Sequence, residues 1–190
     1  RRGSRRARSV TGEVNFVEEG VTTLGTGLFI RLERVVLRAP DGTTHPRDVL
    51  RHPGGVAILP TESGRVWLLR QYRVAVRRPL LEIPAGKRDI ADEPPIEGAR
   101  REMREELGMT ASDWSSLGTM EPSPGYTDEV IHLFAASGIV ADTRHPQGAE
   151  EVEAEVVEMS LDEALAAVDS GEITDAKTQI ALLRWSRRNQ

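Results

Sequence analysis

The sequence predicts an α+β fold in which helices cover both faces of a mixed β-sheet. Strand-like segments occupy the first half of the 190 residues, a strongly amphipathic helix pattern follows near residue 100, and further strands precede two helical segments. This order is typical of an α/β/α sandwich and not of a parallel βαβ array. The hydrophobic share of 38% and the charged share of 29% are ordinary for a globular protein with a real core.

The first half contains four expected strands. They lie at 28–37, 47–50, 56–59 and 66–72. The first ends at the turn Pro40-Asp41-Gly42 and pairs with the second as a hairpin. The third is a short apolar run of the buried type, which Pro60 and the turn at 62–64 bring to an end. Residues 11–55 are therefore expected to form an N-terminal β extension, ahead of a main domain at 56–190.

The second half contains three expected helices. The first begins after two prolines, and Gly108 ends it. Its apolar positions recur at helical spacing: Ile96, Ala99, Met103 and Leu107. Further strands are expected at 115–120, 129–136 and 154–159. Ser160 and Glu163 form a capping-box pattern that opens a helix at about 161–169, and a last helix covers about 174–187.

Composition limits where in the cell the protein is expected and which ligands a metal site can use. No apolar run approaches the ~20 residues that a membrane span needs, so no membrane association is expected. The chain has no cysteine. This excludes disulfides, thiolate zinc sites and thiol nucleophiles, so a metal site has to use oxygen or imidazole ligands. A cytoplasmic location fits this composition.

The charge is unevenly spread along the chain. Five arginines give the first nine residues a charge of +5, which leaves 20 basic against 30 acidic residues for the remainder. Nucleic-acid binding depends on neutralising phosphates, so the acidic body is not expected to bind nucleic acid. Residues 1–10 are interpreted as a flexible basic tail and not as a nucleic-acid-binding arm.

The expected helix near residue 100 concentrates carboxylates on one side. At 100° per residue, Glu102, Glu105 and Glu106 occupy an arc of roughly 100° beside the apolar stripe. Like charges one turn apart repel by ~0.2–0.5 kcal/mol per pair, whereas a hard divalent cation on their oxygens would turn this repulsion into a site. Arg101 can orient the carboxylates by bidentate pairing. A solvated, charge-rich helix remains the competing interpretation of the helix alone.

The spacing around this helix resembles the Nudix box. The matching positions are Glu93, Arg101-Glu102, Glu105-Glu106 and Gly108, with aliphatic residues at 103 and 109. One departure is visible, because six residues separate Gly86 from Glu93 where the usual box has five. The sequence is identified as a member of the Nudix hydrolase family, and the resemblance implies the Nudix fold, an α/β/α sandwich with a mixed sheet.

The flanks of the box resemble the ADP-ribose pyrophosphatase branch of that family. The similarity lies at 80–86 before the box and at 123–129 after it, and Pro124 stands fifteen residues past Met109. A proline at that distance is a marker for ADP-ribose hydrolysis, and the extra residue before the helix is similar to actinobacterial members. The resemblance covers roughly residues 20–185 and implies hydrolysis of ADP-ribose to AMP and ribose 5-phosphate by metal-activated water.

The resemblance also implies roles within the carboxylate cluster. Glu102, Glu106 and the backbone carbonyl of Ala85 would bind Mg²⁺, with Mn²⁺ as a possible substitute. Glu105 and Arg101 would belong to the same catalytic cluster. A later acidic residue would act as general base or further ligand, on the loop at 148–153. Glu151 is preferred there, although Glu150 and Glu153 stay open, as does an acidic loop that is merely solvated.

Candidate substrate contacts lie on both sides of the box. Arg73 and Arg78 are candidates to hold the diphosphate, or else they solvate the end of a strand. Glu82 is a candidate for hydrogen bonds to adenine or ribose. Phe29 is a candidate stacking residue, with core packing as the alternative. Pro124 and Glu129 complete the expected contacts, and the two histidines at 52 and 132 are assigned no role.

The same branch forms intertwined homodimers, which implies that the N-terminal strands help to complete the partner's active site. A small sheet with one apolar face also needs something to cover it, and folding back on its own chain is the alternative. Two other functions stay open: the same chemistry on a sugar nucleotide or an oxidised nucleoside triphosphate, and a regulator that binds ADP-ribose without cutting it. The complete carboxylate set argues against the regulator.

Overall fold

The computed structural model describes residues 15–188, which form two compact units, one ending at Leu50 and one beginning at Arg51. The first unit is a three-stranded sheet in the order β1-β2-β3, with β1 at Val17–Thr26, β2 at Arg31–Arg38 and β3 at Thr44–Arg51. Strands β1 and β2 pair antiparallel. The basic tail expected at 1–10 lies outside the described residues.

The sequence does not predict β1, and its first expected strand begins too early. Register shifts next to Gly20 and Gly25 interrupt β1, so its side chains lack the regular alternation that marks a strand. Residues 28–30 precede β2 and belong to a turn in which the Gly27 N–H donates to the carbonyl of Ile30 at 2.8 Å. The strand expected at 47–50 is present and is longer, because β3 already begins at Thr44.

The second unit is built on a seven-stranded mixed sheet. Strands β4 to β10 are Gly55–Glu62, Arg65–Arg73, Arg78–Glu82, Ala85–Lys87, Met109–Met120, Ile131–Ala141 and Glu155–Ser160. The main path runs β10-β5-β4-β9-β8, with β6 beside β5 and β7 beside β4. Strands β4 and β9 are parallel, and the other paired strands are antiparallel. The predicted mixed sheet is therefore confirmed.

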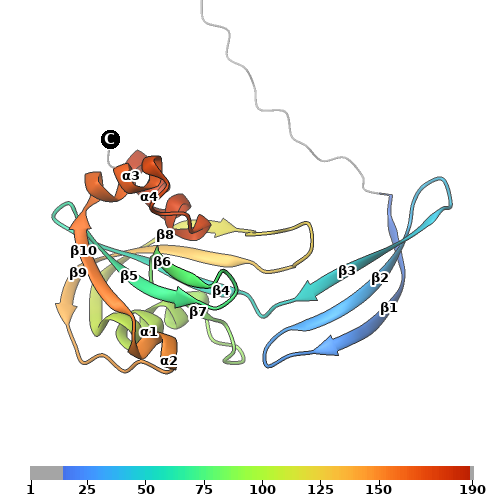
Figure 1. The fold of residues 1–190 in the computed structure, drawn as a ribbon, viewed down its shortest axis with the longest axis horizontal. Coiled ribbons are helices and arrows are strands. Elements are labelled where there is room, and N and C mark those ends of the chain that lie inside the picture. Colours follow the sequence, from blue (N-terminus) through green and yellow to red (C-terminus); the bar gives the residue numbers. More distant parts are fainter. Residues whose placement is uncertain (1–14, 189–190) are drawn as a thin grey trace, which may run out of the picture. The chain divides into compact units, whose positions relative to one another are not determined.

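Helices cover both faces of this sheet, as expected for an α/β/α sandwich. Helix α1 (Pro95–Leu107) lies on one face, and α3 (Leu161–Ser170) and α4 (Ala176–Arg188) lie on the other (Figure 1). The short helix α2 (Ala149–Val152) precedes β10. None of the helices within residues 15–188 is long and apolar enough to cross a membrane.

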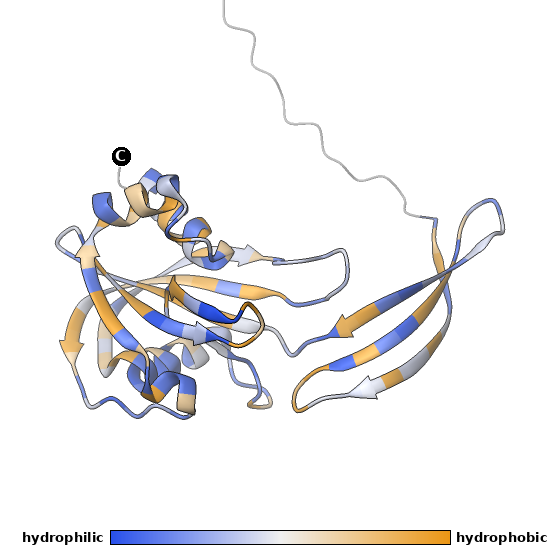
Figure 2. Ribbon diagram, viewed as in Figure 1, coloured by the Kyte–Doolittle hydropathy of each residue, from blue (hydrophilic) through white to orange (hydrophobic). Residues whose placement is uncertain are grey.

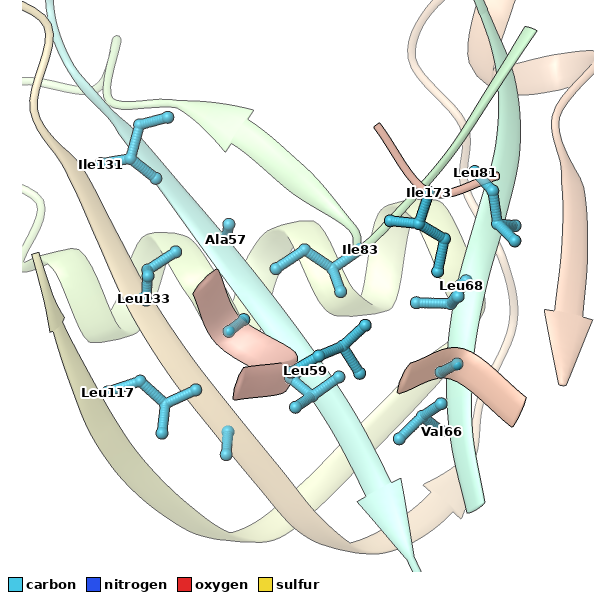
Figure 3. Packing of buried hydrophobic residues seen from close by; sticks show 14 of the residues in the cluster. Ala57, Leu59, Val66, Leu68, Leu81, Ile83, Leu117, Ile131, Leu133 and Ile173 are labelled. Atoms are coloured by element: carbon cyan, nitrogen blue, oxygen red, sulfur yellow. The ribbon is translucent and has the colours of Figure 1, made fainter. Parts of the chain in front are cut away.

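The two faces of β4 explain why two cores form. Val56 and Ile58 pack in the cluster that includes Met103 of α1, whereas Ala57 and Leu59 pack in the cluster under α3 and α4 (Figure 3). A central strand that is buried on both faces reads as a continuous apolar run, which is why 56–59 was recognisable.

Three local features decide where the predicted elements begin and end. Helix α1 ends as expected where Gly108 adopts a left-handed conformation, with φ of 63°. The capping box of α3 is confirmed, since Ser160 and Glu163 each accept from the other's backbone N–H. The expected break at Pro60 is wrong, because β4 continues to Glu62. Pairing with β5 starts only at Thr61, and a proline is tolerated where one neighbour is absent.

Candidate active site

Helix α1 presses its carboxylates against strand β7. Glu102 and Glu106 are only 7% and 2% exposed, although both are acidic. The backbone N–H of Ala85 donates to Glu106 Oε2 at 2.9 Å. A β-carbon added at Gly86 would lie 1.9 Å from the Cδ atom of Glu102, so glycine at this position lets the strand and the carboxylate meet. The three residues expected as metal ligands thus lie at one contact between α1 and β7.

Burial raises the pKa of both carboxyl groups. The pKa of Glu106 rises to about 8, chiefly through burial, and the charges of Glu102 and Glu151 add to the effect. Burial likewise raises the pKa of Glu102 to about 7, with a further contribution from Glu151. Such shifts mean that burial disfavours the charged form of both carboxyl groups, and a bound divalent cation would favour that form.

Arg101 holds the outer part of the cluster together. Its Nη1 atom donates to Glu102 Oε1 at 2.7 Å and to Glu105 Oε2 at 3.1 Å. Its Nε and Nη2 atoms donate to the two oxygens of Glu93 at 3.2 and 3.3 Å. The extra residue between Gly86 and Glu93 therefore leaves Glu93 inside the same ion-pair network.

The donor set suits a hard divalent cation. Among residues 15–188, no three acidic or histidine side chains stand close enough together to enclose a cation in this arrangement. One reason is that Arg101 holds both Glu102 and Glu105. The chemistry nevertheless fits, because two buried carboxylates with raised pKa values supply oxygen ligands beside the backbone of β7.

Helix α2 brings Glu151 next to this cluster. The charge of Glu151 acts on both Glu102 and Glu106, raising their pKa values. Arg144 fastens α2 to the end of α1, donating to the backbone carbonyls of Glu106 at 2.5 Å and of Glu151 at 2.6 Å. Of the three glutamates that the sequence leaves open on this loop, the placement favours Glu151.

A second charged group adjoins the carboxylates. Arg73 donates from Nε to Glu82 Oε1 at 2.6 Å and from Nη2 to Glu82 Oε2 at 3.0 Å. Lys177 of α4 also donates to Glu82 Oε2, and to Asp175 Oδ1 at 2.9 Å. Burial lowers the pKa of Arg73, but the hydrogen bond to Glu82 and the negative charges of Glu82, Glu106 and Asp175 outweigh it and raise the pKa. Arg73 is therefore hydrogen-bonded to Glu82 and interacts electrostatically with Glu106 of the carboxylate helix.

The structure gives the following surroundings for the other expected substrate contacts. Arg78 begins β6 and donates to Thr174 Oγ1 at 2.9 Å. Pro124 is exposed on the loop between β8 and β9. On the same loop, the carboxylate of Glu129 lies 3.6 Å from His52 Nδ1. Phe29 belongs to the first unit, where its side chain is half exposed.

The sequence does not predict the place of Arg144 or Asp175 at this site, nor that of Lys177. Lys177 is 9% exposed, at the second residue of α4. A lysine in the first turn of a helix has the less favourable sign for the helix dipole, but this does not identify its partner. That partner, Glu82, is distant in sequence, and hydrophobic periodicity does not reveal such a pair.

Comparisons with known proteins agree with this architecture. A family model described as NUDIX domain matches residues 50–180. An ADP-ribose pyrophosphatase of Bacillus subtilis (strain 168) is 37% identical over 144 residues, which are 75% of this chain and 77% of the relative. A methanol dehydrogenase activator of Bacillus methanolicus is 34% identical over 171 residues, which are 88% of this chain and 91% of that protein.

A solved structure shows the same fold at lower sequence identity. A crystal structure of an ADP compounds hydrolase matches with a TM-score of 0.81 at 20% identity, covering 91% of this chain and 93% of that chain. The family model covers more than half of the chain and includes the carboxylate helix. The chain therefore belongs to the NUDIX family and is a Nudix hydrolase.

Proposed function

We propose that this Nudix hydrolase cleaves the pyrophosphate bond of ADP-ribose and releases AMP and ribose 5-phosphate. The observation that carries the proposal is that a pair of buried carboxyl groups lies near an arginine. Glu102 and Glu106 are buried carboxyl groups with raised pKa values, whereas Arg73, which interacts electrostatically with Glu106, has a partly exposed side chain. A cation would bind to the carboxyl groups, and a diphosphate would bind to both the cation and Arg73. The similarity to an ADP-ribose pyrophosphatase supports the choice of substrate.

Nudix hydrolases generally use divalent metal ions, and we propose Mg²⁺ here, with Mn²⁺ as a substitute. Glu102, Glu106 and the carbonyl of Ala85 would hold it. Bound there, the ion supplies neutralisation of the diphosphate charge and acidification of the attacking water. The proposal includes a cytoplasmic location.

The protein's own residues then have separate tasks. Glu151 accepts the proton of the water as its oxygen attacks one phosphorus, and the bond from that phosphorus to the bridging oxygen breaks. Arg73 holds the diphosphate by the edge of its guanidinium that Glu82 does not use. Because Glu82 is buried behind Arg73, we propose that it orients this arginine, in place of the direct contact with adenine or ribose expected from the sequence. Glu105 and Arg101 hold the carboxylate cluster together through their ion pair.

Substrate selectivity tests this proposal. With saturating Mg²⁺, kcat/KM for ADP-ribose should exceed that for GDP-mannose and for 8-oxo-dGTP by at least about tenfold, or ~1.4 kcal/mol in transition-state binding. The measurement is AMP, GMP or nucleotide release across the three substrates at equal enzyme concentration. A flat profile, or a preference for the triphosphate, would contradict the ADP-ribose proposal and leave membership of the hydrolase family untouched.

We also propose a homodimer whose N-terminal strands help to complete the partner's active site, with Phe29 as a candidate stacking residue. The first unit consists of three strands, and apolar segments run along them (Figure 2). Large apolar side chains stay exposed on this unit: Phe16, Val17, Val21, Leu24, Phe29 and Leu32. A three-stranded sheet gains stability when such side chains are covered, and a symmetric partner covers both copies with one patch.

Sedimentation at micromolar concentration should therefore give a species of twice the 21.0 kDa chain mass. Val21→Glu should produce monomers, because Val21 is 51% exposed and forms an apolar pair with Val35 of the neighbouring strand. Thr22→Glu, on the opposite face of the same strand, is the matched control and should stay dimeric. A 21.0 kDa species for the wild-type protein would refute the dimer. Mixing Glu106→Gln and Phe29→Ala chains should restore activity if the sites are shared.

A further inference from the structure

Lys177 occupies a position that stability alone does not explain. Its ammonium group is nearly buried and contacts the carboxylates of both Glu82 and Asp175. Asp175 has a task of its own, since its Oδ2 accepts from the backbone N–H and the hydroxyl of Thr178 at 2.9 and 2.6 Å and so caps the start of α4. Burying a lysine is costly unless its charge is needed by its partners.

The charge balance shows what that charge does. Glu82 and Asp175 contribute two negative charges, and Arg73 and Lys177 contribute two positive charges, so the group is neutral. Without Lys177, the same group would carry one net negative charge beside Arg73. Negative charge at this place opposes the binding of an anionic diphosphate.

Arg73 has N–H donors that Glu82 does not use and that a diphosphate can accept. A guanidinium has five N–H donors, and Glu82 engages Nε and one N–H of Nη2. Within residues 15–188, Nη1 of Arg73 has no hydrogen-bond partner, and the side chain is 38% exposed. The unused edge belongs to an arginine that interacts electrostatically with Glu106. Arg73 is therefore near enough to Glu106, a proposed cation ligand, for the two charges to interact.

We propose that Lys177 is a positioning residue for the substrate, acting through Glu82 on Arg73 to keep the unused edge of that guanidinium attractive to a diphosphate. Lys177 neutralises Glu82 from the interior, so Glu82 fixes the orientation of Arg73 without cancelling its positive charge. The inference rests on the proposed function, because it takes Arg73 as the ligand of the diphosphate.

Substitution of Lys177 separates this role from a structural one. Lys177→Met should raise KM for ADP-ribose about tenfold or more while kcat stays within about threefold, because one charge near the diphosphate is lost. Lys177→Arg keeps the charge and should restore KM. Leu182→Ala is the structural control on the same helix. Leu182 is fully buried in the apolar cluster, so this variant should lower the melting temperature and leave KM unchanged.

A double variant tests the charge argument itself. Glu82→Gln combined with Lys177→Met restores electrical neutrality, so its KM should return several-fold towards the wild-type value relative to Lys177→Met alone. This variant also avoids an unpaired buried carboxylate, so it remains informative if Lys177→Met fails to fold. In that case Lys177→Arg tests the charge argument, and its KM should stay within about threefold of wild type.

The possible failures are distinguishable. A wild-type KM in Lys177→Met, or an equal rise of KM in Leu182→Ala, would overturn the role of Lys177 while the wild-type enzyme still hydrolyses ADP-ribose. A KM in the double variant no better than in Lys177→Met would overturn the electrostatic explanation. Absence of ADP-ribose hydrolysis in the wild-type protein would instead defeat the proposed function, and with it the inference for this substrate.

Discussion

Glu106→Gln should lower kcat for ADP-ribose by about 100-fold or more at saturating Mg²⁺, because it removes a charged ligand from the proposed cation site. The fold should survive, since the amide oxygen of glutamine can still accept the N–H of Ala85, which donates to Glu106 at 2.9 Å in the native protein. Steady-state kinetics and circular dichroism of the same preparation measure the two effects. Turnover near that of the wild-type enzyme would refute the role of Glu106.

The pH dependence of stability provides the control for this variant. The pKa of Glu106 is about 8 in the folded protein, well above the ordinary value of 4.5. The folded protein therefore holds this proton more tightly than the unfolded chain does, and stability is lost as the pH rises towards 8. In EDTA, the melting temperature of the wild-type protein should fall over this range, and that of Glu106→Gln should fall less. An identical slope in the two proteins would contradict the assigned environment of Glu106.

Glu151→Gln should lower kcat by about 10²- to 10⁴-fold, the usual contribution of a general base, with a much smaller effect on KM. Glu150→Gln and Glu153→Gln are matched controls on the same loop, with the same change of charge, and should keep kcat within about threefold. The difference arises because the charge of Glu151 acts on both Glu102 and Glu106. Single-turnover kinetics of the three variants measures it.

Two results would count against Glu151. Equal losses in all three variants would show that the loop matters only through its total negative charge. A loss confined to Glu150→Gln or Glu153→Gln would move the proton acceptor to that residue. Arg144→Ala is not a substitute for this test, because Arg144 bonds to backbone carbonyls of both Glu106 and Glu151 and its removal would disturb both.

The parts of the fold that the sequence predicts are those with strong local signals. Helix α1 has an apolar stripe with Gly108 as its end, and α3 has the Ser160–Glu163 box, so both are recovered within a residue or two. Strands β6 and β7 are short and α2 has four residues, too few to display a period. Strand β1 is exposed along its whole length, so burial imposes no pattern on it.

The candidate site likewise has features that the sequence predicts and features that it does not. The clustering of Glu102, Glu105, Glu106 and Arg101 follows from helix geometry and was predictable. The Glu82–Lys177 pair joins β6 to α4 across 95 positions of sequence. The role of Gly86 depends on how closely β7 approaches Glu102. Tertiary packing creates both features, and a single sequence carries no local trace of such contacts.

Product analysis tests the central claim most directly. Purified wild-type protein is incubated with ADP-ribose and Mg²⁺, with a parallel sample in excess EDTA, and the products are separated and quantified. The proposal predicts AMP and ribose 5-phosphate in equal amounts, with no detectable turnover in EDTA and activity restored by added Mg²⁺. Intact ADP-ribose after prolonged incubation with Mg²⁺, in a protein that nevertheless binds it, would contradict hydrolysis and identify a binding protein on a Nudix fold.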